Sequence, residues 1–370
     1  MEEALVNLGE PVSSGRLRYV DIAKGIAIIA VIVGHVAMSY SSKSAFAWRV
    51  EAACFTFHMP LFFMLSGYFL KPDKYSFKRD ARHLIVPYVV GGCTIALAAT
   101  IVTMWLQDAD SAVGPIRQLL RWLNAVAFGA GFLPGNPLWH QTKYIGGLWF
   151  LLALFWARLI VATIDRHIRP LALRLAVVVG LAVAGVLTAK AVWLPWSIQA
   201  GMCAAMFVWS GSRLRDLNAP SGGEARLRRS GAFWVVAVTA WIVSIGVYSD
   251  YRVSNCILGT SLFALVWNMI GSYAGSACVV GGSRLIESHL ERLSQVLAAL
   301  GRNTLLILFV HIFELDVVRW YIPRAQALAV FPHPGWIFLC DALIRVVIDC
   351  CMAGLLARSG AVRELVGGKR

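Results

Sequence analysis

The sequence predicts an all-α integral-membrane protein, a polytopic bundle of about ten transmembrane helices with both termini in the cytoplasm. Two features of the composition favour this class: 58% of the 370 residues are hydrophobic and only 15% are charged, and the mean hydropathy is +0.67. A soluble domain of this length is more polar. The third observation is the length of the apolar runs, because a helix that crosses a bilayer needs about 20 mostly apolar residues.

Ten apolar runs of suitable length follow one another along the chain. They cover residues 20–40, 52–70, 84–105, 147–164, 171–189, 192–210, 231–248, 256–280, 294–314 and 335–357. No repeat and no Gly/Ser- or Pro-rich linker divides them. We therefore expect one membrane domain over residues 19–358, between a cytoplasmic segment 1–18 and a cytoplasmic tail 359–370.

The positions of the basic residues predict the orientation of these helices. A net charge of +14 would suggest a nucleic-acid partner in a soluble protein, but here the cations gather in alternate loops. The segments expected in the cytoplasm hold 22 of the 34 lysines and arginines, and the outward segments hold nine. The positive-inside rule then places both ends in the cytoplasm. We expect a lipid bilayer as the surroundings and no nucleic-acid partner.

Other segments of the chain lie outside the apolar runs. The first residues are polar and acidic, without the basic region of a cleavable signal, so we expect the first helix to be retained. The outward loop 106–146 is rich in Gly, Pro and aromatic residues, which predicts a structured cap with a short interfacial helix over 116–130. The basic residues of the segment 211–230 predict a flexible loop in the cytoplasm. The eight cysteines lie mostly in apolar runs and read as buried small hydrophobes.

Two ionisable residues bracket the apolar part of the first helix. Lys24 and His35 are eleven residues apart, which brings them to within about 20° of the same helix face and separates them by about 16 Å. Ionisable side chains inside a membrane are costly and usually face the bundle interior or a water-filled cavity. The structural alternatives are a snorkelling lysine and a histidine in an interhelical hydrogen bond.

The second helix combines His58 and Pro60 with Ser66-Gly67, where small residues permit close helix contact. Taken alone it reads as a kinked packing helix. Glu51 stands at its expected outward entrance, where a carboxylate could meet a polar substrate. An exposed loop acid would look the same.

An arginine pair precedes the third helix on the cytoplasmic side. Arg79 and Arg82 are three residues apart and share a helical face. Paired guanidinium groups suit phosphate oxygens. The pair therefore predicts a site for the phosphates of a nucleotide-like donor, with membrane anchoring as the alternative.

The ninth helix carries a second imidazole at membrane depth. Asn303 lies near its cytoplasmic start, and His311 follows about 12 Å further in. His311 and Asp316 also match the H-x4-D pattern of glycerolipid acyltransferases, a match that we interpret as chance because that family's other context is missing.

Several of these segments together resemble the acyltransferase-3 family of multi-spanning membrane acyltransferases, and within it the bacterial polysaccharide O-acetyltransferases that include fucose 4-O-acetylase-like proteins. The resemblance covers nearly the whole chain. It rests on the order and spacing of Tyr19 to Gly25 with His35, Phe57 to Phe63 with Ser66-Gly67-Tyr68, Arg79-x-x-Arg82 before Pro87-Tyr88, Leu148 to Leu151, Leu194 to Ser197, and Leu300 to Thr304 with His311.

The resemblance implies transfer of an acyl group, usually acetyl from acetyl-CoA, to a hydroxyl of a glycan or lipid-linked oligosaccharide in the bacterial inner membrane. The family's basic residue and histidine map onto Lys24 and His35, its arginine pair onto Arg79 and Arg82, and its Ser-Gly motif onto Ser66. Thr304 stands where the family more often has serine. Polysaccharide-assembly proteins would be further partners.

These residues suggest a mechanism without a metal. Arg79, Arg82 and Lys24 would hold the phosphates of acetyl-CoA, and His35 would act as general base on the acceptor hydroxyl. His311, Asn303 or Ser66 would stabilise the oxyanion. The remaining substrate contacts are assigned to Glu51, His58 and Trp149.

The main alternative to an enzyme is a polytopic transporter or flippase of a glycan or small anion. In that case Lys24, His35 and His311 would form a relay, and broken helices would recur in two related halves of the chain. The sequence leaves open the acceptor, an acetyl or succinyl donor, direct transfer or an acyl-enzyme, and the oligomeric state.

Overall fold

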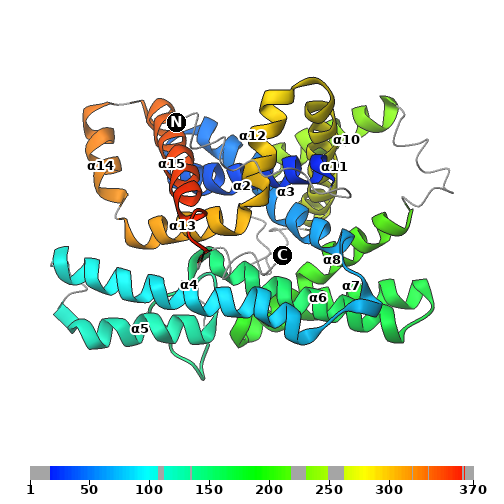
Figure 1. Ribbon diagram of the computed structural model, residues 1–370, viewed down its shortest axis with the longest axis horizontal. Coiled ribbons are helices and arrows are strands. Elements are labelled where there is room, and N and C mark those ends of the chain that lie inside the picture. The colour runs from blue at the N-terminus through cyan, green and yellow to red at the C-terminus, as the bar shows by residue number, and fades with distance from the viewer. Residues whose placement is uncertain are drawn as a thin grey trace.

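In the computed structural model, residues 17–106, 112–133, 136–217, 231–248, 262–318, 320–331, 333–360 and 362 are described. Every regular element in these residues is a helix, which confirms the all-α class (Figure 1). Exposed apolar side chains cover the outer helices, for example Ile101 and Trp105 in the third span. Such a surface fits lipid rather than water.

Five helices of the described residues are long and apolar enough to cross a bilayer. They are α2 (Arg18–Met38), α3 (Ala45–Tyr68), α4 (Phe77–Leu106), α6 (Trp149–His167) with the preceding 3₁₀ turn η3 (Gly146–Leu148), and α7 (Leu171–Ala191). The other predicted runs also overlap helices, namely α8 (Ile198–Leu217), α10 (Gly231–Gly246), α11 (Leu262–His289) and α15 (Pro334–Leu356). By length and composition, five or six helices of the described residues could each span a membrane, and the number of ten stays a prediction.

The predicted ninth helix is broken, which corrects the continuous helix expected over 294–314. It consists of α12 (Glu291–Arg302) and α13 (Thr304–Val317), bent by 71° at Asn303, and together they make the sixth candidate span. The Asn303 side chain donates to the Ala299 carbonyl at 2.8 Å, which caps the end of α12. The bend turns α13 beneath α2 and lets Thr304 face a cavity described below.

The outward loop contains the predicted short helix, α5 (Pro115–Phe128), which ends at Gly129 with a left-handed φ of 77°. The 3₁₀ turn η4 (Pro195–Ser197) packs on this end of α5. Trp196 and Ser197 have positive φ values of 62° and 51°, and the Ser197 hydroxyl donates to the Gly129 carbonyl at 2.6 Å. Positive φ in residues other than glycine costs about 1–3 kcal/mol, so these contacts have to hold η4 in place.

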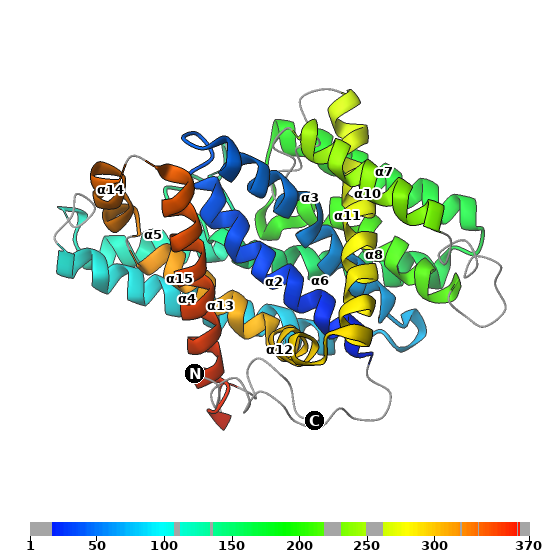
Figure 2. The same cartoon turned by 90° about the horizontal axis from the view of Figure 1, so that it is seen from above.

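The helices form two superimposed groups. In Figure 1, α4, α5 and α6 run across the lower half, while α2, α3, α12 and α15 lie above them. Figure 2 shows α2 running diagonally through the upper group, with α3 on one side and α15 on the other. Two shorter elements complete the described chain, η1 (Pro72–Lys74) and α14 (Tyr321–Val330).

Glycines bring α2 and α12 into backbone contact. A Cβ added at Gly25 would overlap the carbonyl of Leu297, and a Cβ added at Gly301 would overlap the carbonyl of Asp21. The two glycines thus lie in the same crossing, one from each helix. Small residues at a crossing let membrane helices approach closely, and this contact fixes the start of α2, where Lys24 lies.

A second glycine crossing joins α3 to α8. Gly67 meets the backbone of Val208, and Gly211 meets the backbone of Met64. This confirms the close helix contact expected at Ser66-Gly67. It also shows that residues 211–217 of the predicted flexible loop belong to α8, while residues 218–230 lie outside the described residues.

Segments assigned to the cytoplasmic side by their charge meet one another in the structure. Arg166 donates to the Tyr75 carbonyl at 3.0 Å, and Arg215 donates to the Leu70 carbonyl. Arg213 pairs with Asp165 at 2.8 Å. Three of the segments predicted to be cytoplasmic therefore lie on the same side of the bundle, some of their cations are held in specific contacts, and the orientation of the bundle in the membrane stays a prediction.

Candidate active site

A cavity of about 840 Å³ lies between the two groups of helices. Its walls come mainly from α2, α3, α6 and α13, and its lining is mostly apolar. The polar side chains that line it are Lys24, His35, Ser39, His58, Ser66, Tyr144, Trp149, Arg158, Thr304 and Asp316. Five of the residues singled out from the sequence therefore share one cavity: Lys24, His35, His58, Ser66 and Trp149.

Lys24 and His35 face the cavity from the same side of α2, as their spacing predicts. Both side chains are half-buried. The Nδ1 of His35 lies 2.8 Å from the Val31 carbonyl one turn earlier. Because a carbonyl can only accept, Nδ1 carries the proton, and in the neutral imidazole the lone pair is on Nε2. This is the tautomer that a general base in the cavity needs.

The packing of α2 on α3 places Ser66 far from His35. Gly34 lies against Cys54 and Phe55 of α3. On α3, Ser66 lies eleven residues after Phe55, about 16 Å from the contact with Gly34. On α2, Lys24 lies ten residues before Gly34, a similar distance from the same contact. Since the two helices are antiparallel, Lys24 and Ser66 lie at one end of the cavity and His35 at the other.

Arg158, one of the 22 cations assigned above to the expected cytoplasmic segments, joins Lys24 and Ser66 at that end. Its guanidinium binds Asp80 through two nitrogens at 2.6 and 3.2 Å, and donates to the Ser66 hydroxyl at 2.9 Å. Both charged side chains are largely enclosed. The Ser66 oxygen accepts this bond, so its own proton can be donated elsewhere.

Arg79 and Arg82 are exposed at the start of α4 and do not line the cavity. Arg79 donates to the Lys74 carbonyl at 2.9 Å. Asp80, between them, turns inward to Arg158, and Leu84 lines the cavity one turn further on. The arginine pair thus lies outside the cavity, near the end that contains Lys24 and Arg158.

His58 and Trp149 lie towards the other end. The His58 ring is 5.0 Å from that of Phe55, which in turn is 5.7 Å from that of His35. Its Nδ1 lies 2.7 Å from the Cys54 carbonyl, so His58 has the same tautomer as His35. Tyr144 also lines this end, and burial together with the Asp316 charge raises the pKa of its phenol. Tyr144 is therefore a neutral hydrogen-bond donor.

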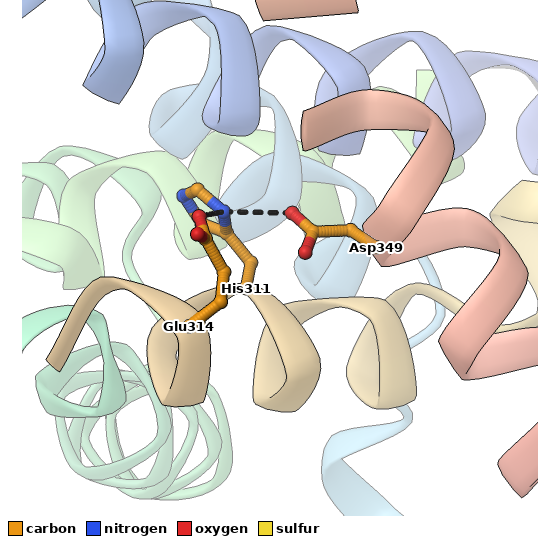
Figure 3. A group of neighbouring side chains, drawn as sticks. All are labelled: His311, Glu314 and Asp349. Atoms are coloured by element: carbon orange, nitrogen blue, oxygen red, sulfur yellow. Dashed lines mark hydrogen bonds and ion pairs between the residues drawn. The ribbon is translucent and has the colours of Figure 1, made fainter. Parts of the chain in front are cut away.

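His311 is fully buried behind His35 rather than in the cavity lining. The two ring centroids are 5.3 Å apart. Figure 3 shows His311 and Glu314 on α13 and Asp349 reaching towards them from α15, with Nδ1 of His311 2.9 Å from Asp349 and 3.3 Å from Glu314. The Nη1 of Arg345 lies 3.2 Å from the Oε1 of Glu314. His311 therefore supports His35 from behind.

The same cluster has the composition of a metal site. His311, Glu314 and Asp349 offer three ligand atoms within 4.8 Å of one another. However, Nδ1 of His311 lies 2.9 Å from Asp349 and the Arg345 guanidinium lies 3.2 Å from Glu314, so both carboxylates already have partners in the protein. An ion-paired network accounts for these contacts, and the absence of a metal from the mechanism stays a prediction.

Two residues predicted to contact substrate lie elsewhere. Glu51 is 1% exposed, because α3 begins at Ala45 and carries Glu51 inside the bundle instead of at an outward entrance. Asn303 lies at the break between α12 and α13, and its neighbour Thr304 faces the cavity in its place. Neither Glu51 nor Asn303 lines this cavity.

The comparison with protein families decides the class of the protein. The model of an acyltransferase domain, acyltransferase-3, matches residues 17–344, which include every residue that lines the cavity. The chain belongs to the acyltransferase-3 family. No curated protein and no solved structure matches the chain. The protein is therefore a membrane acyltransferase, and the cavity of this acyltransferase-3 chain is its candidate active site.

Proposed function

We propose that the protein transfers an acetyl group from acetyl-CoA to a hydroxyl of a surface glycan or exopolysaccharide, or of its lipid-linked repeat unit, in the bacterial inner membrane. One observation carries this proposal: a single cavity has cations, Lys24 and Arg158, at one end and a correctly oriented imidazole, His35, at the other. A long thioester donor entering from one side and a hydroxyl acceptor from the other would meet in such a cavity.

The donor would enter at the end that contains Lys24. The exposed Arg79 and Arg82 would bind the phosphates of acetyl-CoA at the cytoplasmic surface. The pantetheine arm would then pass Leu84 and Phe69. The Lys24 ammonium lies 5.8 Å from the centroid of the Phe69 ring. An apolar lining suits the arm, and its length would carry the thioester towards His35.

The chemistry at His35 is direct acyl transfer. Nε2 of the neutral imidazole takes the proton of the acceptor hydroxyl, whose oxygen attacks the thioester carbonyl carbon. The new C–O bond forms, the C–S bond breaks, and the imidazolium returns the proton to the thiolate of coenzyme A. The bond between Nδ1 and the Val31 carbonyl, together with the His311 ring behind, would keep the imidazole in this orientation.

The two ends of the cavity assign different roles to the remaining polar residues. Ser66 lies with Arg158 at the donor end, about 16 Å from His35 along α3, so it is better placed to contact the donor than to carry the acyl group or stabilise the oxyanion at His35. Tyr144 and Trp149 are placed to contact the acceptor. His58 is the alternative base, because it has the same tautomer and also faces the cavity.

The transporter alternative requires broken helices in two related halves. Within the described residues one helix pair, α12 and α13, is broken in this way. The family match favours the enzyme, and a transporter would not need acetyl-CoA.

The test is release of thiol from acetyl-CoA by the purified protein in lipid nanodiscs, with glycan from a strain that lacks the gene as acceptor. We expect thiol release that depends on the glycan, together with new O-acetyl groups on it. Thiol release without acetylated glycan would disprove the proposed acceptor class. A preparation that retains bound acetyl-CoA but releases no thiol with any glycan fraction would disprove the transfer itself.

A further inference from the structure

A second cavity of about 280 Å³, the side chamber, adjoins the main cavity. The two share Ser39, Leu315 and Asp316 in their linings. Ser39 is exposed and lies one turn beyond His35, about 6 Å along the helix axis. A molecule that enters at this junction could therefore occupy the side chamber and present one group to the imidazole of His35.

The charged groups around the side chamber are matched among themselves. Three cations line it, Lys143, Arg324 and Arg345, and three carboxylates lie in or behind the lining, Asp316, Asp341 and Glu314. The Nε of Arg345 lies 2.9 Å from Asp341 and its Nη1 lies 3.2 Å from Glu314. Lys143 interacts electrostatically with Asp316. Because a charged ligand would bring a charge without a counter-charge into this site, the lining favours an uncharged ligand.

Five buried polar atoms of the lining have no hydrogen-bond partner within the part of the chain that the structure describes. Two of them are the Nε2 and Oε1 of Gln118 on α5, a residue that is 0% exposed. The others are the indole nitrogens of Trp122 and Trp320 and the Oδ2 of Asp316. Since a buried polar atom without a partner costs free energy, a ligand that satisfies these atoms gains affinity.

These five atoms require a ligand that both donates and accepts hydrogen bonds. The amide nitrogen of Gln118 and the two indole nitrogens donate, whereas the amide oxygen of Gln118 and the Oδ2 of Asp316 accept. A hydroxyl group does both, while an ether or a ketone only accepts. Gln118 and Trp122 are four residues apart on α5 and present their polar atoms from one helix face. A sugar ring, with several hydroxyls on a small rigid frame, matches this arrangement.

From the side chamber we infer that the acceptor binds there through an uncharged sugar ring, with its hydroxyls on Gln118, Trp122 and Asp316. The inference rests on the proposed function, since it names the acceptor subsite and the substrate class of the same enzyme. The ring hydroxyl nearest to Ser39 would be the one that reaches Nε2 of His35. Charged units of the same glycan would stay outside the side chamber.

Binding of simple glycosides tests this inference without turnover. The neutral probes are methyl β-glucoside, methyl β-galactoside and methyl α-mannoside. Each is compared with the uronic acid and the amino sugar of the same ring by saturation-transfer NMR, on the full-length protein in lipid nanodiscs. We expect a neutral glycoside to bind about tenfold more tightly than either charged counterpart. If no neutral glycoside binds, the side chamber holds only water, and if a charged counterpart binds equally well, the site does not select an uncharged ring. Either result would overturn the inference.

Gln118→Leu localises the bound glycoside. The substitution removes both amide atoms at similar side-chain size, so it should weaken binding of that glycoside about tenfold. The melting temperature should stay the same or rise, because two buried atoms without partners disappear. Gln295→Leu, the same change at an exposed glutamine of α12 that lines neither cavity, should leave the affinity unchanged. Unchanged affinity in Gln118→Leu, or a lower melting temperature that shows a structural role for the amide, would contradict the assignment.

The sugar site and the proposed reaction can fail separately. If a neutral glycoside binds through Gln118 and the protein releases no thiol from acetyl-CoA with any glycan fraction, the reaction is wrong while the sugar site stands. If acetyl transfer to glycan proceeds and Gln118→Leu leaves the KM for the glycan unchanged, the reaction stands and the side chamber is not the acceptor site.

Discussion

The imidazole of His311 lies against that of His35, with ring centroids 5.3 Å apart, and its Nδ1 lies 2.9 Å from Asp349. His311 is fully buried and touches neither cavity. This arrangement makes it a positioning residue, because it limits the rotation of His35 and is itself oriented by Asp349.

His311→Gln should therefore lower kcat about 10–100-fold, the loss typical when an outer residue that orients a functional histidine is removed. The KM for acetyl-CoA should stay the same, since the donor end of the cavity is not touched. Steady-state thiol release measures both constants. Asp349→Asn should give the same pattern with a smaller effect. An increase in the KM for acetyl-CoA with unchanged kcat would contradict the positioning role.

The pair formed by Arg158 and Asp80 makes a separate prediction. Arg158→Ala leaves the 6% exposed Asp80 carboxylate without its counter-charge, which should lower the free energy of unfolding by about 3–5 kcal/mol. Asp80→Asn in the same chain should restore part of that stability, because the unpaired charge is gone. Thermal unfolding followed by intrinsic fluorescence measures the change.

The catalytic constants separate this structural effect from donor binding. The double variant should still have a raised KM for acetyl-CoA, because Arg158 lines the donor end. Arg166→Ala, at an exposed arginine of the same helix, serves as the matched control. A double variant with normal stability and a normal KM would mean that Arg158 is purely structural.

Arg79 and Arg82 should act on donor affinity alone. Each Gln substitution should raise the KM for acetyl-CoA about tenfold, the equivalent of one charge-assisted hydrogen bond to phosphate. The increase in KM caused by each substitution should become smaller as the salt concentration rises, because both arginines are exposed and salt screens their charges. Lys78→Gln is the control, since Lys78 is also exposed at the start of α4. Unchanged KM values in both arginine variants would mean that Arg79 and Arg82 do not bind the phosphates of acetyl-CoA.

The cluster of His311, Glu314 and Asp349 predicts the result of metal removal. Because Arg345 and His311 already pair with the carboxylates, dialysis against EDTA should leave thiol release and thermal stability unchanged. The metal content of the purified protein should be well below one ion per chain. Loss of activity on chelation, with recovery on addition of one divalent cation, would show that these residues bind a metal.

The sequence alone predicts the helical class because apolar length is a local property. Each apolar run overlaps a helix of the structure, and even the short helix α5 was expected. The 71° bend at Asn303 was not expected, although the polar stretch Arg302-Asn303-Thr304 interrupts the run 294–314 at that point, because a polar interruption alone does not reveal a change in helix direction. Lys24 and His35 were found for the same local reason, as a helix face can be read from spacing.

What the sequence does not reveal is pairing between helices. Arg158 was counted among cytoplasmic charges, yet its place in the apolar string Leu-Phe-Trp-Ala-Arg-Leu-Ile-Val is a signal of an intramembrane group. The acids Glu314 and Asp349 give the same signal, whereas Asp80 lies in the charged stretch Lys78 to His83 and does not. Their partners lie on other helices, as with Arg158 and Asp80, 78 residues apart, so only the fold identifies them.

The central claim is that His35 is the base at the point where donor and acceptor meet. His35→Gln keeps a polar side chain of similar size but cannot take a proton, so thiol release from acetyl-CoA in the presence of acceptor should fall about 100–10,000-fold. Acetyl-CoA binding should be retained, and His140→Gln, at an exposed histidine outside both cavities, should have no effect. Acetyl transfer by His35→Gln at the wild-type rate would contradict the claim and point to His58.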